Sequence, residues 1–206
     1  MPANRLCAFL FCLPLTLAAA DSESASHWIK TEKQWSELQT GKVILLDSTL
    51  SAEEDVKSHS ATAAIIVDAV PDVVRNVVED GNKAAGFQES LVSSEILERS
   101  GDTTLVKQVA KVGFHKVSYI VCQTAENPSF MSFKLVEGDL KQMDGFWRFL
   151  PISSDSGTKT LLVYRLSLEP NIPIPGFMIR KSIANNLPNT LVSVKEETLR
   201  RADGSS

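Results

Sequence analysis

The segment Gly145-Phe146-Trp147-Arg148-Phe149-Leu150-Pro151 is the first of two neighbouring apolar runs in the C-terminal half of the chain. The second is Thr160-Leu161-Leu162-Val163-Tyr164-Arg165-Leu166-Ser167-Leu168. Between them, Asp155-Ser156-Gly157 has the composition of a tight turn. The pattern predicts a hairpin that closes an antiparallel sheet.

A proline-rich elbow and a long amphipathic segment follow the hairpin. The elbow is Glu169-Pro170-Asn171-Ile172-Pro173-Ile174-Pro175-Gly176, and because each proline fixes φ and lacks an N–H, no strand or helix continues through it. Strain is expected at this corner if Gly176 takes a positive φ, and Gly176→Val would then destabilise the fold. Beyond it, apolar residues recur at helical spacing, namely Ile179, Ile183, Leu187, Leu191 and Val194. The sequence therefore predicts a C-terminal helix laid across the sheet.

These segments resemble the START-like superfamily called SRPBCC, in its polyketide-cyclase-like and coenzyme-Q-binding-like branch. The resemblance is carried by Gly145-Phe-Trp-Arg-Phe, Glu169-Pro170, Ile174-Pro175-Gly176 and Leu187-Pro188-x-Thr190-Leu191. An earlier segment, Ile66-Val67-Asp68-Ala69-Val70-Pro71-Asp72-x-Val74, is similar to the strand-to-helix entry of these domains. The chain departs from the family pattern at Arg75, where an aromatic residue is usual, and at Gly81 to Gly86, where a proline-bearing segment is expected.

The resemblance spans about residues 61–201 and implies an α+β, helix-grip (START/Bet v 1-like) fold. In this fold a curved antiparallel sheet, here of about six to seven strands, wraps around a long C-terminal α-helix. The residues agree, because short segments with alternating apolar residues fill the middle of the chain, separated by turn residues such as Gly101, Gly113 and Pro128. No internal repeat or linker divides this part into two domains.

The N-terminal part is predicted to have two sections. Residues 1–20 read as a secretory signal peptide, with Arg5, an apolar run and Ala18-Ala19-Ala20 as the cleavage site, so we expect an exported protein, periplasmic or secreted. Residues 21–60 are expected to form an extension with a short helix and strand. Its residues Trp28, Trp35 and Leu38 favour a cap over one end of the barrel, the alternative being an aromatic patch that covers a ligand or makes transient contact with a membrane surface. Residues 202–206 are predicted to be a disordered tail.

Several functional classes are disfavoured. A net charge of −4 without a basic stripe argues against a nucleic-acid partner. The histidines His27, His59 and His115 lack metal-ligand spacing and are expected to be exposed to solvent, so no metal is predicted. The absence of a G-x-S-x-G elbow and of a P-loop disfavours hydrolases and nucleotide-dependent enzymes, and no cofactor is predicted. Cys122, in an apolar strand, is expected to be a packing residue.

The apolar side chains of the sheet and the C-terminal helix either line a pocket or fill a core. The aromatic residues in question include Phe114, Phe130, Phe146 and Phe149. Among polar groups, the Arg148 guanidinium could bind a carboxylate or phenolate in two-pronged geometry, and two tyrosines face the same space if they lie on the inner strand faces. The predicted ligand-binding residues are Tyr119, Phe133, Trp147, Arg148, Tyr164, Met178, Ile183 and Leu187, and no catalytic residue is assigned.

Three functions are compatible with these patterns. The first is an exported protein that holds a hydrophobic small molecule, lipid, quinone-like or polyketide-like, between sheet and helix. The second is a cyclase or dehydratase that uses the same cavity, which requires two ionisable groups facing each other inside it. The third is an envelope interaction module with a filled core and an exposed apolar patch. The oligomeric state is left open.

Overall fold

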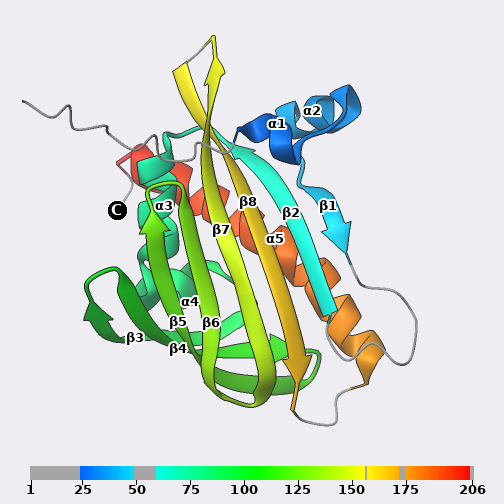
Figure 1. Ribbon diagram of the computed structural model, residues 1–206, viewed down its shortest axis with the longest axis vertical. Coiled ribbons are helices and arrows are strands. Elements are labelled where there is room, and N and C mark those ends of the chain that lie inside the picture. Colours follow the sequence, from blue (N-terminus) through cyan, green and yellow to red (C-terminus); the bar gives the residue numbers. More distant parts are fainter. Residues whose placement is uncertain (1–23, 49–58, 156, 172–174, 205–206) are drawn as a thin grey trace, which may run out of the picture.

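The computed structural model describes residues 24–48, 59–155, 157–171 and 175–204. It consists of one curved sheet with the long C-terminal helix running across its inner face (Figure 1). The elements are α1 (Ala25–Trp28), α2 (Glu32–Gln39), β1 (Ile44–Ser48), β2 (His59–Val67), α3 (Pro71–Glu79), η1 (Gly81–Lys83), α4 (Ala84–Phe87), β3 (Leu91–Ser100), β4 (Thr103–Val112), β5 (His115–Asn127), β6 (Phe130–Gly138), β7 (Leu140–Ser154), β8 (Gly157–Pro170) and α5 (Gly176–Ala202). The predicted signal peptide lies outside the described residues.

The sheet has eight antiparallel strands in the order β1-β2-β8-β7-β6-β5-β4-β3. Strands β3 to β8 follow one another as hairpins, and the predicted β7–β8 hairpin is present, with Ser154 opposite Gly157. Strand β2 pairs with β8 along its whole length, from His59 opposite Leu168 to Val67 opposite Thr160. The strand count exceeds the predicted six to seven because β1 of the N-terminal extension pairs with β2.

Strand β2 is buried at every position, so both of its faces are covered. Ala63 and Ile65 belong to the inner hydrophobic cluster beneath α5, whereas Ala64 and Ile66 belong to a second cluster on the outer face. Leu38 of α2 and Ile29 lie in this outer cluster. The predicted cap is therefore wrong in its position, because α1 and α2 cover the outer face of the sheet rather than one end of the barrel (Figure 1).

Helices α3 and α5 pack against each other on the inner side of the sheet. Pro71 and Asp72 begin α3, where a missing N–H and a negative charge are both favourable. At the far end of α5, the buried Glu197 accepts hydrogen bonds from Arg200 at 2.8 Å and Arg201 at 2.7 Å. Arg201 also forms an ion pair with Asp80 at 3.1 Å, which joins α5 to the residue that follows α3.

Two local predictions are wrong. Gly176 is the first residue of α5 and does not have a positive φ, because it already belongs to the helix, with Pro175 as the N-cap at φ −55°. His59 is not exposed but buried, with 3% of its surface accessible, because it is the first residue of β2 and pairs with Leu168 of β8. Burial lowers the pKa of His59, and the nearby Arg180 lowers it further.

Candidate ligand-binding cavity

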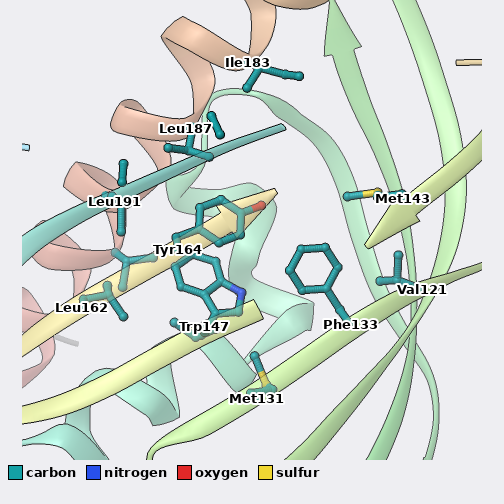
Figure 2. Packing of buried hydrophobic residues seen from close by; sticks show 14 of the residues in the cluster. Val121, Met131, Phe133, Met143, Trp147, Leu162, Tyr164, Ile183, Leu187 and Leu191 are labelled. Carbon is teal, nitrogen blue, oxygen red and sulfur yellow. The ribbon is translucent and has the colours of Figure 1, made fainter. Parts of the chain in front are cut away.

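An internal cavity of about 130 Å³ lies between the inner face of the sheet and α5. Strands alternate their side chains between faces, and residues from the inner face of β4, β5, β6, β7 and β8 reach the cavity. Helix α5 closes it with residues at helical spacing. Its apolar and aromatic lining includes Val117, Tyr119, Val121, Phe133, Met143, Trp147, Tyr164, Ile179, Ile183 and Leu187, several of which are shown in Figure 2.

One wall of the cavity consists of stacked aromatic rings. The rings of Trp147 and Tyr164 are nearly parallel, with centroids 3.9 Å apart and an interplanar angle of 9°, and the Phe133 ring lies 6.1 Å from that of Tyr164 (Figure 2). Gly145 makes this packing possible, because a Cβ atom there would lie 2.5 Å from Phe133 Cζ and 2.1 Å from the carbonyl oxygen of Arg165. The glycine of the Gly-Phe-Trp-Arg-Phe segment thus leaves room for the aromatic wall.

Two tyrosine hydroxyl groups belong to the cavity lining. Tyr119 is 6% and Tyr164 9% exposed, and among the described residues neither hydroxyl has a hydrogen-bond partner. Burial raises the pKa of both phenols well above the ordinary value, and the proximity of Tyr119 raises that of Tyr164 further. At neutral pH both groups therefore keep their protons and act as hydrogen-bond donors.

The cavity opens to solvent through a wider groove of about 580 Å³ beside α5. Cavity and groove share lining residues, which identifies the groove as the mouth. These shared residues are Gln88, Ser90, Lys111, Ser182, Asn186 and Thr190. At the edge of the mouth, Phe114 in the β4–β5 turn is fully exposed and Phe177 at the start of α5 is 62% exposed.

The cavity brings together six of the eight predicted ligand-binding residues, namely Tyr119, Phe133, Trp147, Tyr164, Ile183 and Leu187. Met178 lies in the groove at the mouth instead. Arg148 is not part of either lining, because the strand alternates and Trp147 takes the inner side. Its guanidinium carbon lies 3.9 Å from the centroid of the Phe130 ring, so the predicted role in binding a ligand carboxylate or phenolate is corrected.

The other aromatic candidates do not line the cavity. Phe114 is exposed at the mouth, Phe149 is fully buried in the inner cluster, and Phe130 and Phe146 pack against each other with centroids 5.7 Å apart. Sequence reasoning missed the neutral polar residues of the lining, which include Gln108, Gln123 and Asn186. A glutamine in an alternating strand gives no signal that separates an inward side chain from a solvent-facing one.

Histidine, cysteine and acidic side chains do not converge in the part of the chain that the structure describes. No group of three or more His, Cys, Asp or Glu side chains there is arranged to hold a metal ion. No helix among the described residues has both the length and the apolar character needed to cross a membrane. Cys122 is a free thiol of intermediate burial.

Comparison with known proteins agrees with this architecture. The chain matches the family described as "Polyketide cyclase / dehydrase and lipid transport" over residues 67–193, and it belongs to this family of the START-like SRPBCC superfamily. A search of curated proteins finds no match.

Solved structures with the same fold include TTHA0849 from Thermus thermophilus, with 27% identity, a TM-score of 0.61 and coverage of 69% of this chain and 99% of that one. The Zhui aromatase/cyclase from Streptomyces sp. R1128 has 18% identity and a TM-score of 0.61 over 70% of this chain and 96% of its own. A STAR-related lipid transfer protein from Xanthomonas axonopodis has 13% identity and a TM-score of 0.58 over 76% of this chain and 92% of its own. The helix-grip fold predicted from the sequence is confirmed.

Proposed function

We propose that this protein is an exported carrier that holds a hydrophobic small molecule, lipid, quinone-like or polyketide-like, between its sheet and α5. The observation that supports this most directly is the apolar cavity closed by Ile183 and Leu187 of α5. Its volume of about 130 Å³ is close to that of an engineered cavity, about 150 Å³, that accepts benzene. A longer ligand would place one ring or chain end in the cavity and the remainder in the groove at the mouth.

The two alternatives have less support. A cyclase or dehydratase needs a group that exchanges protons near neutral pH, whereas burial raises the pKa of both cavity tyrosines away from that range. An interaction module with a filled core does not account for a cavity beneath α5. The names of the similar structures, an aromatase/cyclase and a lipid transfer protein, agree with hydrophobic ligands in this fold.

Binding of the neutral fluorescent probe N-phenyl-1-naphthylamine tests the carrier function. The parent protein should bind it, and Ile183→Trp should abolish binding because the indole fills the cavity, at a small cost in stability. The matched control is Val192→Trp, which adds the same side chain to α5 at a partly exposed position and should leave binding unchanged. Absence of probe binding by the parent, together with a loss of about 1–3 kcal/mol in Ile183→Trp from overpacking, would contradict the proposal.

Export is the second part of the proposal and depends on the signal-peptide pattern of residues 1–20. Expression of the full chain in a bacterium with a Sec pathway, followed by mass spectrometry of the mature protein, should give an N-terminus at Asp21. A retained Met1 would contradict export at this site.

The third part is transient contact of the mouth with an anionic membrane surface, from which a hydrophobic ligand is loaded. Phe114 and Phe177 are exposed there beside Lys111 and Lys181, a combination that suits insertion into anionic headgroups. Sedimentation with vesicles containing phosphatidylglycerol should recover the parent, and Phe114→Ser with Phe177→Ser should lower recovery. Leu97→Ser, an exposed position on β3, is the control that should not. Equal recovery of all three proteins would contradict the contact.

A further inference from the structure

Neutral polar side chains predominate in the groove at the mouth of the cavity. On the α5 side they recur at helical spacing and form one stripe, whose members are Ser182, Asn185, Asn186, Asn189 and Ser193. At the rise of an α-helix this stripe is about 16 Å long. Gln88 and Ser90, before β3, also line the groove. The groove therefore presents amides and hydroxyls along its length, in contrast to the apolar cavity that it adjoins.

The charges of the groove lie where water reaches them. Glu89, Lys111 and Lys181 are the charged residues of the described lining, and all three are exposed. Charges that stay hydrated and differ in sign give an ionic group inside the groove little attraction. Ser182 and Asn186, by contrast, are partly buried and line both groove and cavity. The inner part of the groove thus suits an uncharged polar group.

The asparagines of the stripe are unfavourable for the helix that carries them. Asparagine ranks low in helix propensity because its short amide competes for backbone hydrogen bonds, yet three occur between residues 185 and 189 in the interior of α5. Asn186 Nδ2 donates a hydrogen bond to Ser182 Oγ at 2.9 Å. Among the described residues, the amides of Asn185 and Asn189 have no side-chain partner. Helix stability does not account for these two residues, whereas recognition of a ligand in the groove does.

The chemistry of the stripe matches a compound with several hydroxyl groups. A carboxamide has two donors and an acceptor in one plane, and a hydroxyl group both donates and accepts. Each hydroxyl of a sugar or other polyol offers the complementary pair of functions. The volume of the groove, about 580 Å³, lies in the range of small-molecule sites, roughly 300–1,000 Å³.

From these observations we infer that the groove is a binding site for an uncharged polyhydroxyl group, such as a sugar, that the hydrophobic ligand carries outside the cavity. Because Ser182 and Asn186 line both spaces, one molecule can occupy them together. The inference rests on the proposed carrier function and adds a second, polar site to it.

Three ligands with the same aromatic part test the groove at pH 7 by displacement of N-phenyl-1-naphthylamine. They are 2-naphthyl β-D-glucoside, which has an uncharged polyol, 2-methoxynaphthalene, which lacks it, and 2-naphthyl phosphate, which is anionic. We expect the glucoside to bind about 5- to 30-fold more tightly than 2-methoxynaphthalene, as one or two additional hydrogen bonds allow. The phosphate should bind more weakly than the glucoside at about 0.15 M salt, where exposed charges are screened.

The test variant combines Asn185→Ala with Asn189→Ala, since both residues line the groove and neither lines the cavity. It should lower the affinity for the glucoside about 5- to 30-fold and leave that for 2-methoxynaphthalene unchanged. Its Tm should not fall, because alanine is the better helix former, so a loss of glucoside binding cannot come from unfolding. Glu196→Ala is the matched control, at an exposed position of α5 outside both linings, and should keep the preference for the glucoside.

The outcomes separate this inference from the proposed function. If neither the probe nor 2-methoxynaphthalene binds, the carrier function fails and the polyol site fails with it. If both bind but the glucoside binds no more tightly, the polyol site alone is overturned. Tighter binding of 2-naphthyl phosphate than of the glucoside would make the groove an anion site through Lys111 and Lys181, and this also overturns the inference. So does a preference for the glucoside that survives the loss of both amides.

Discussion

The two ends of the sheet are packed in different ways. Around β2, β8 and β7 both faces are covered, the inner one by α5 and the outer one by α1 and α2, and β2 is buried at every position. At the other end, β3 is mostly exposed and β5 alternates between buried and less buried residues. The first end is a three-layered region, whereas the second is a single curved wall, and the cavity lies between this wall, α5 and inner residues of β7 and β8 such as Trp147 and Tyr164.

This difference separates stability from binding within one sheet. Packing on both faces of β2 and β8 buries the apolar surface that holds the fold together. The wall formed by β3 to β6 needs only one covered face, so its inner side can carry polar residues such as Gln108 and Gln123 and leave space for a ligand. We therefore expect substitutions in the outer cluster at the first end to change stability alone, and substitutions of the inner residues that line the cavity to change binding.

The largest effect is expected at Gly145, on β7 where the two ends meet. A methyl group in Gly145→Ala would collide with the Arg165 carbonyl oxygen and with Phe133, so strand or ring must shift. We expect a loss on the order of 3 kcal/mol in the free energy of unfolding, together with weaker probe binding, measured by denaturant titration. Gly86→Ala in α4 is the control, because a Cβ there meets nothing within 4 Å, and it should be neutral or stabilising. Equal stability of the two variants would show that Gly145 is not required for close packing.

A smaller effect, confined to the first end, is expected for Leu38→Ala in α2. Leu38 is fully buried in the outer cluster, so its truncation should cost about 2–4 kcal/mol. Binding of N-phenyl-1-naphthylamine should not change, because the sheet separates this cluster from the cavity. Leu45→Ala, at an exposed position of β1, should cost less than about 0.5 kcal/mol. Loss of probe binding in Leu38→Ala would mean that the two faces are coupled.

Acid should weaken the attachment of α5 at its C-terminal end. The hydrogen bond from Arg200, with further contributions from Arg201, outweighs burial and holds the pKa of Glu197 at about 2. Because the folded-state pKa lies below the unfolded value of about 4.5, the stabilisation is complete above pH 4.5 and is lost as the pH falls toward 2.

Thermal unfolding measured across this pH range tests whether protonation of Glu197 causes the loss of stability in acid. Glu197→Gln should lower stability at pH 7 by about 1–3 kcal/mol, since the three charge-assisted hydrogen bonds from Arg200 and Arg201 are weakened. It should also flatten the decline between pH 4.5 and 2. Glu95→Gln on the exposed strand β3 is the control and should keep the parent's slope. An unchanged slope in Glu197→Gln would assign the acid sensitivity to other carboxylates.

The sequence predicted the elements of the fold better than the faces that they bury. Alternation and helical spacing are local signals, so the hairpins and α5 followed from them, and the family resemblance supplied the topology. The partner of α2 could not be predicted, because the spacing of Trp28, Trp35 and Leu38 indicates an apolar side without saying which surface covers it. At the site, the same alternation that places Trp147 inside places Arg148 outside, and applying it strictly would have removed Arg148 from the candidates.

The smallest effect concerns the corner before α5, where the sequence suggested strain at Gly176. The structure gives Gly176 no positive φ, and a Cβ there would lie 3.3 Å from a terminal nitrogen of Arg180, the flexible end of a partly exposed side chain that can move aside. Gly176→Ala should therefore change stability by less than about 1 kcal/mol, and stabilise if the lost freedom of the unfolded chain prevails. Gly113→Ala is the contrasting case, because its φ is +60° and its Cβ would lie 2.4 Å from Met178 Cε at the mouth of the cavity. Thermal unfolding of the two variants should show a lower Tm only for Gly113→Ala. A larger loss of stability in Gly176→Ala than in Gly113→Ala would place backbone strain at the corner before α5.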